Sequence, residues 1–177
     1  GCSVLRPDLL QLLSCLNKFA ACQFPMGVQV NATANCLDNG ICLLLDGPEN
    51  WHQGILENMA SWAETAGLAR LSIAVDGAIP LTIYAPTPPL ITFGEIALNP
   101  PAGVFLQATV EAEAIMQAFV AEHSKGANRI IDLFAGCGTL SLPMLYRLSH
   151  LTAAELNLPA LTALKAGADA AGRGAQV

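Results

Sequence analysis

The sequence predicts an α/β protein in which an α+β part is followed by the start of an open parallel sheet. Two observations predict the sheet. The apolar run 129–133 leads into a loop of small residues, 135–138, and then into a helical pattern. A second short strand, 151–154, ends in the acid Glu155. This order of strand, glycine loop, helix and acid-ended strand is half of a doubly wound sheet.

The first part of the chain mixes helical and two-residue periodicity. Leucines at helical spacing predict a helix over 7–21, and alternation from Gly27 together with the turn Asp38-Asn39-Gly40 predicts a hairpin. The remaining elements expected here are a helix over 51–66 and strands over 71–75 and 81–85.

Three prolines, Pro86, Pro88 and Pro89, mark a boundary, because proline cannot continue a strand ladder. We therefore predict an α+β central domain over 1–87 and a second, incomplete domain over 88–177. In the second domain the expected helices cover 107–123, 140–148 and 159–171. In the first of them, Val110, Ala114, Ile115 and Ala118 are spaced to cover one face of the helix.

Composition narrows the classes of function. The chain has a net charge of −6 and no basic stripe, which argues against RNA binding by this chain unaided. There is no apolar run of about 18 residues, so no membrane-spanning segment is predicted. No secretory signal is evident, and the six cysteines contain no Cys-x-x-Cys pair, which favours a reducing, cytoplasmic location.

The loop 135–138 is suited to holding a nucleotide-like ligand. Gly136 and Gly138 lack a Cβ, so the backbone can turn sharply and approach a ligand closely. Amides that open the following helix would then point at polar groups of the ligand. A buried strand followed by an ordinary turn would show the same sequence pattern. The acids on either side of the loop are therefore needed to distinguish a ligand site from such a turn.

Glu155 lies 17 residues beyond Gly138, where such folds place an acid against ribose hydroxyls. The alternative is an acid that merely precedes a helix and is favoured by its dipole. A dinucleotide loop would have a third glycine, whereas Leu140 and Ser141 stand there. Asp132 at the strand end repels a pyrophosphate and suits a cationic sulfonium and amino group. The chemistry therefore favours S-adenosylmethionine.

The segment Asp132–Pro143 resembles motif I of the RNA 5-methyluridine (uracil-C5) methyltransferases, a class I family dependent on S-adenosylmethionine. Two further segments carry the same resemblance: Pro101–Gln107, with its Phe-x-Gln ending, and Ala154–Asn157. The resemblance implies a Rossmann-like methyltransferase fold, methyl transfer to C5 of uridine in RNA, and ribosomal RNA as the expected substrate. The cofactor-binding residues implied by the motif and the loop are Gln107, Asp132, Phe134, Gly136, Gly138, Thr139 and Glu155.

The resemblance extends to the first residues of the chain. The segment 1–7 is similar to the family's Cys-Pro-[Val/Ile]-Leu-x-Pro segment, with Ser3 in place of the usual proline. It implies that Cys2 is the fourth ligand of an iron–sulfur (4Fe–4S) cluster in the intact protein. Within this chain the cluster's other ligands are missing.

The family's nucleophilic cysteine, which attacks C6 of uracil, has no counterpart after Glu155. We therefore expect no catalytic residue here, and interpret the chain as an internal fragment, inactive alone, that holds a cofactor half-site. A sheet cut after its second strand exposes an edge and apolar faces, so self-association is expected. Two alternatives stay open: part of a nicotinamide-dependent oxidoreductase, and a non-catalytic interaction module.

Overall fold

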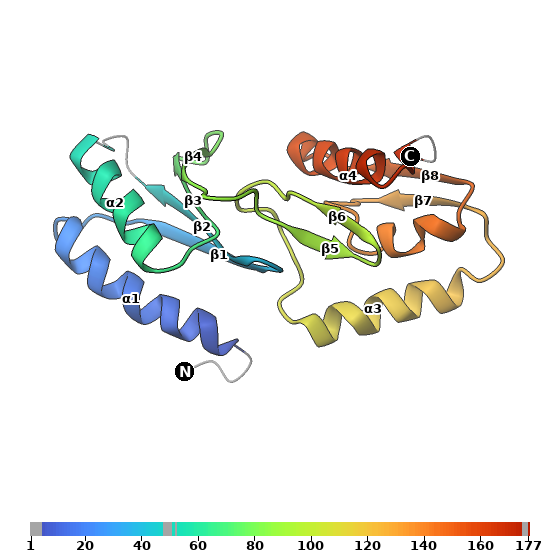
Figure 1. Ribbon diagram of the computed structural model, residues 1–177, viewed down its shortest axis with the longest axis horizontal. Helices are drawn as coiled ribbons and strands as arrows, with labels where there is room; N and C mark the ends of the chain where they lie inside the picture. Colours follow the sequence, from blue (N-terminus) through green and yellow to red (C-terminus); the bar gives the residue numbers. More distant parts are fainter. Residues whose placement is uncertain (1–4, 48–50, 52, 175–176) are drawn as a thin grey trace. The chain divides into compact units, whose positions relative to one another are not determined.

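The computed structural model describes residues 5–47, 51, 53–174 and 177. The chain divides into two compact units, residues 1–89 and 90–177 (Figure 1). The sequence placed its boundary two residues earlier, at 87/88. Within the described residues, no helix is long and apolar enough to cross a membrane.

The first unit is a four-stranded sheet covered by two helices. Its elements are α1 (Pro7–Gln23), β1 (Asn31–Leu37), β2 (Gly40–Gly47), α2 (Gln53–Thr65), β3 (Arg70–Val75) and β4 (Leu81–Tyr84). The strand order is β1-β2-β3-β4, with β2 and β3 parallel across the α2 crossover and the outer pairs antiparallel. The predicted alternating strand begins at Asn31 rather than near Gly27.

The core of the first unit lies between the helices and one face of the sheet. Leu43 is paired with Leu71 and Leu45 with Ile73, so these side chains form two adjacent rows on that face. They pack against Leu12 and Phe19 of α1 and Met59 and Ala63 of α2. The Phe19 and Trp62 rings stack at a centroid distance of 4.7 Å and join the two helices. The apolar residues at helical spacing and those at two-residue spacing therefore pack into one core.

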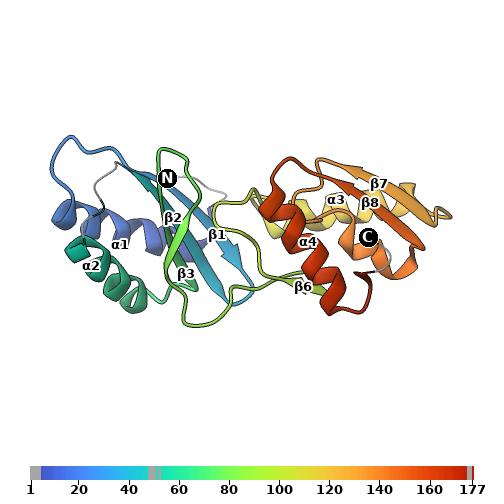
Figure 2. The same ribbon diagram turned by 90° about the horizontal axis from the view of Figure 1, so that it is seen from above.

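The second unit carries the predicted loop. Its elements are β5 (Ile91–Phe93), β6 (Ile96–Leu98), α3 (Val110–His123), β7 (Arg129–Leu133), the 3-10 helix η1 (Leu142–Arg147), β8 (His150–Ala154) and α4 (Leu158–Ala170). β5 and β6 form an antiparallel hairpin (Figure 1), and β7 and β8 pair in parallel (Figure 2). At Gly167 of α4 an added Cβ would lie 2.9 Å from Leu98 Cβ, so glycine lets α4 approach β6 closely.

Two sequence-based expectations for the second unit are wrong. The segment expected as a helix over 140–148 is a six-residue 3-10 helix with Pro143 in its first turn. The helix expected over 107–123 begins at Val110, after the cap Thr109, and buries no residue fully. The face that carries Val110 and Ile115 is exposed, at 64% and 69% for these two residues. Helical periodicity located the apolar stripe, but it does not say which apolar stripe meets the sheet.

Candidate functional site

The glycine loop lies at the carboxyl end of β7 and is built largely from backbone hydrogen bonds. Ala135 N–H donates to Ala154 O at 3.1 Å, which joins the loop to the end of β8. Gly138 N–H donates to Ala135 O at 2.8 Å and closes a tight turn. Phe134 precedes the turn with φ +61° and an 84% exposed ring. A bulky residue in the left-handed region is strained, a feature that concentrates at functional sites.

The two glycines meet different requirements. At Gly138, φ is +86° and an added Cβ would lie 2.6 Å from Leu142 Cγ, so both conformation and packing demand glycine. At Gly136, φ is +54° and no atom lies within 4 Å of an added Cβ. The space beside Gly136 is therefore open to a ligand, whereas Gly138 anchors the loop to the core.

Glu155 joins the ends of the two parallel strands. Its Oε2 accepts a hydrogen bond from Gly136 N–H at 2.8 Å, and its Oε1 accepts one from Asn157 N–H at 2.8 Å. These bonds favour the ionised carboxylate, so the backbone N–H groups of Asn157 and Gly136 hold the pKa of Glu155 below its ordinary value. The Glu155 carboxylate is therefore charged at neutral pH and lies beside Gly136, where there is space for a ligand.

Two supporting residues were not among the sequence-based candidates. Gln117 of α3 donates from Nε2 to Thr139 O at 3.0 Å and fixes the far side of the loop. Asn157 caps α4, because its Oδ1 accepts from Ala160 N–H at 3.1 Å. The Asn157-Leu158-Pro159 run is a standard helix-start signal that could have identified Asn157. No sequence pattern singles out Gln117.

The predicted cofactor residues are partly brought together. Asp132, Phe134, Gly136, Gly138 and Thr139 follow one another along β7 and its loop, and Glu155 reaches the loop through its hydrogen bond to Gly136. Gln107 lies in the irregular segment between β6 and α3 and is partly buried. Among the described residues, no hydrogen bond joins Gln107 to the loop.

Cys137 lies inside the loop, but its thiol has low reactivity. Its side chain is 1% exposed, and burial, reinforced by the negative charge of Glu155, raises the pKa of the Cys137 thiol to about 11. A thiol with that pKa is protonated at neutral pH and is a poor nucleophile. The geometry therefore argues against Cys137 as a nucleophile.

Cys2, the implied iron–sulfur ligand, lies outside the described residues, so its role stays a prediction. Within the part of the chain that the structure describes, no group of three or more histidine, cysteine, aspartate or glutamate side chains could hold a metal ion.

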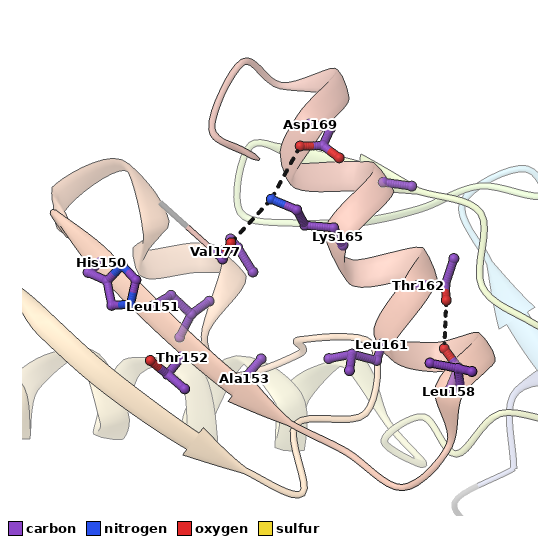
Figure 3. A pocket seen from close by; sticks show the side chains of 11 residues that line it. His150, Leu151, Thr152, Ala153, Leu158, Leu161, Thr162, Lys165, Asp169 and Val177 are labelled. Atoms are coloured by element: carbon purple, nitrogen blue, oxygen red, sulfur yellow. Dashed lines mark hydrogen bonds and ion pairs between the residues drawn. The ribbon is translucent and has the colours of Figure 1, made fainter. Parts of the chain in front are cut away.

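A cavity of about 600 Å³ lies between β8 and α4 (Figure 3), and no residue of the glycine loop lines it. Its walls include Leu151 and Leu161. Lys165 of α4 donates to Val177 O at 3.2 Å and lies 3.5 Å from Asp169 Oδ1, one turn further along the same helix. None of the predicted cofactor residues lines this cavity. Lys165, the one lysine that lines the cavity, is already bound to Val177 O and Asp169 Oδ1 and so is not available to a ligand. We therefore place the candidate site at the glycine loop.

No family model matches the chain, but its sequence is similar to several bacterial proteins. It is 34% identical over 171 residues to an uncharacterised RNA methyltransferase of Mesorhizobium japonicum, and 33% identical over 174 residues to one of Caulobacter vibrioides. These alignments cover 94% and 93% of this chain but 39% and 40% of the relatives. The chain is similar to RNA methyltransferases along nearly its whole length. It spans about two fifths of the length of these curated relatives.

Solved structures agree on the fold. The chain resembles the Pyrococcus abyssi tRNA (uracil-54, C5)-methyltransferase in complex with S-adenosyl-L-homocysteine, with a TM-score of 0.70 and 10% identity over 97% of this chain and 46% of that one. It resembles the tRNA m1G37 methyltransferase of M. jannaschii with a TM-score of 0.55 and 11% identity over 96% of this chain and 50% of that one. The predicted fold class, an α+β part followed by the start of a Rossmann-like methyltransferase fold, is confirmed.

The packing at Gly138 gives a testable prediction, with Gly126 as its control. Both have positive φ, so alanine is strained at both, but only at Gly138 would the new methyl group overlap Leu142. We expect Gly138→Ala to cost about 1–3 kcal/mol more than Gly126→Ala, the usual range for overpacking. Amide hydrogen exchange of β8, which lies in the same unit, measures the difference. Equal losses of protection would contradict the role assigned to Gly138.

Proposed function

We propose that this chain carries the S-adenosylmethionine half-site of an RNA methyltransferase. The observation that carries the proposal is the joining of Gly136 and Glu155 by a hydrogen bond of 2.8 Å at the carboxyl ends of β7 and β8. That edge of a doubly wound sheet is where such folds bind ligands. In the proposal, the free lone pairs of the Glu155 carboxylate accept hydrogen bonds from the two ribose hydroxyls of the cofactor.

The charge and shape of the loop favour this cofactor over a dinucleotide. Asp132 at the end of β7 places a carboxyl near the site, which favours a cationic sulfonium and opposes a pyrophosphate. Phe134 offers an exposed aromatic ring at the start of the loop. In this proposal the ring packs against the cofactor, and the backbone amides of residues 136–139 line its other side.

For the reaction we propose methyl transfer to C5 of uridine, with ribosomal RNA as the substrate. Support comes from the Asp132–Pro143 run, which resembles the motif of uracil-C5 enzymes, and from the higher TM-score, 0.70, with a uracil-C5 methyltransferase than with an m1G37 enzyme, 0.55. Such chemistry needs a thiolate that adds to C6 before C5 attacks the methyl group. We assign that nucleophile to no residue of this chain, since the given sequence has no cysteine after Glu155 and Cys137 is buried with a raised pKa.

Cofactor binding tests the half-site directly. Calorimetric titration should show that the chain binds S-adenosylhomocysteine and that Glu155→Ala weakens binding roughly 10- to 100-fold, because hydrogen bonds to a charged group are lost. Glu95→Ala, which removes an exposed acid of the same unit, should leave affinity unchanged. Preferential binding of NADH would favour the oxidoreductase alternative. If the chain binds neither ligand, the proposal fails and the interaction module remains.

The same titration has a predicted pH dependence. In the folded chain the pKa of Glu155 lies below its ordinary value. Its carboxylate is therefore ionised at neutral pH, and its contribution to cofactor affinity is complete there. Affinity should fall as the pH is lowered through that depressed pKa, where the carboxylate gains a proton and can no longer accept from both N–H groups.

We also propose that copies of the chain self-associate through the uncovered face of the β7–β8 pair. Ile131 and Leu133 are 70% and 64% exposed, and the paired residues Thr152 and Ala154 lie on the same open face. Parallel sheets are normally covered on both faces, so a second copy would remove this apolar surface from water. Sedimentation velocity should show mass rising with concentration, and Leu133→Lys should reduce it. A wild-type monomer at all concentrations would rule the idea out.

A further inference from the structure

Cationic side chains gather at the amino ends of β7 and β8, the opposite end of these strands from the proposed cofactor site. Arg129 begins β7 and is directly paired with His150, which begins β8. Lys125 lies in the loop that joins the end of α3 to the start of β7 (Figure 1). Arg147 ends η1 and donates from Nη1 to Ser124 O at 3.0 Å, which places its guanidinium beside the same loop.

A fourth cation, Arg173, reaches this end of the unit from the residues after α4. Its guanidinium lies 4.5 Å from the centroid of the Tyr146 ring, and Tyr146 directly precedes Arg147. We call Lys125, Arg129, Arg147 and Arg173 the basic edge. These four residues are far apart in the sequence, so it is the fold that brings them together, and no basic stripe is visible in the sequence itself.

The acids near the basic edge do little to neutralise it. Glu122 forms an ion pair with Lys125, but the two side chains are 61% and 72% exposed, and an exposed pair contributes at most about 1 kcal/mol. Lys125 can therefore exchange Glu122 for another anion. Asp169 lies 3.5 Å from Lys165 of its own helix, which balances its charge. The other acids within residues 90–177, all of them in the described part of the chain, are Glu95 between β5 and β6, Glu111 and Glu113 at the start of α3, and Asp132 and Glu155 toward the carboxyl ends of β7 and β8.

The carboxyl end of α3 accounts for part of this cluster but not for all of it. Carbonyl groups at the end of a helix favour nearby cations, and Arg147 donates to two of them, Ala121 O and Ser124 O. Arg129 is different, because it begins a strand and is exposed. Within the described chain its side chain takes part in no hydrogen bond or ion pair. An exposed guanidinium placed among three other cations raises the local positive potential, which indicates an anionic partner.

We propose that the basic edge binds the phosphate backbone of the RNA substrate. The inference rests on the proposed function, in which the substrate is RNA. Three of the four cations are arginines, whose guanidinium groups match phosphate oxygens with two parallel hydrogen bonds. The five residues of β7, at about 3.3 Å each, put the basic edge about 17 Å from the cofactor end of the strand. A folded RNA is longer than this and can contact both ends.

The charge separation also orients the RNA. Phosphate contacts fix the position of a nucleic acid without reading its sequence, so the basic edge would hold the backbone. Asp132 and Glu155 at the other end of the strands repel phosphates and leave the space beside Gly136 to the cofactor. A chain with a net charge of −6 can in this way bind RNA through one edge only.

The salt dependence of RNA binding tests this contact. Fluorescence anisotropy of a labelled RNA hairpin of mixed sequence, titrated with the chain between about 50 and 200 mM KCl, gives the slope of log K against log salt concentration. Each phosphate contact adds about −0.7 to −0.9 to that slope. We expect Arg129→Gln to make the slope shallower by about one unit, because one contact is lost. Arg129→Lys, which keeps the charge, should retain the wild-type slope.

Lys18→Gln is the matched control, because it removes an exposed cation of α1 in the first unit. It should leave the slope unchanged. The affinity for S-adenosylhomocysteine, measured on the same variants, should also stay unchanged in Arg129→Gln, since Arg129 begins β7 and the glycine loop follows its end.

A shallower slope in Arg129→Gln, with wild-type slopes in Arg129→Lys and Lys18→Gln, supports the proposal. Equal slopes in Arg129→Gln and the wild type, or no RNA binding by the wild type, overturn it. If S-adenosylhomocysteine still binds in that case, the proposed cofactor site stands without the basic edge. If the Arg129 effect is present but S-adenosylhomocysteine does not bind, the cofactor site fails and the basic edge stands. Competition by polyglutamate as strong as that by polyuridylate of equal charge overturns the proposal in favour of an acidic protein partner.

Discussion

The Glu155 carboxylate is the contact on which the candidate site depends. Its two oxygens accept from Gly136 N–H and Asn157 N–H, each at 2.8 Å. One carboxylate therefore sets the distance between the glycine loop after β7 and the start of α4 after β8. Without it, the hydrogen bond from Ala135 N–H to Ala154 O would still join the loop to β8, but Gly136 would lose its link to the start of α4. The same group carries the negative charge that a ribose diol would meet, so loop geometry and ligand recognition depend on one side chain.

The sequence predicted this arrangement well where the local chemistry is decisive. Gly138 has to be glycine because of its φ and its contact with Leu142, and Glu155 follows its strand directly. Such constraints act within a few residues and leave a visible pattern. No sequence pattern indicated Gln117, because a glutamine on a helix has the same pattern whether it contacts solvent or the Thr139 carbonyl. That contact depends on how α3 packs against the loop, which is set by tertiary structure.

The sequence-based expectations that were wrong, those for α3 and for the segment that forms η1, have a related cause. The apolar residues of α3 repeat at helical spacing, yet the helix begins three residues later than expected and its stripe with Val110 and Ile115 is exposed. The segment after the loop has helical composition, yet Pro143 in the first turn of η1 removes an N–H, and the segment forms only a short 3-10 helix. Donors to a ligand would therefore come from the loop amides rather than from the end of a long helix.

The central claim is that S-adenosylmethionine binds at the end of β7 with Glu155 as its ribose contact. The most direct test is a two-dimensional amide NMR titration of the chain with S-adenosylhomocysteine. We expect the amide signals of Gly136, Gly138, Thr139 and Asn157 to shift in a saturable way, while those of β1–β4 in the first unit stay in place. Shifts confined to the first unit, or to the walls of the cavity between β8 and α4, would contradict it.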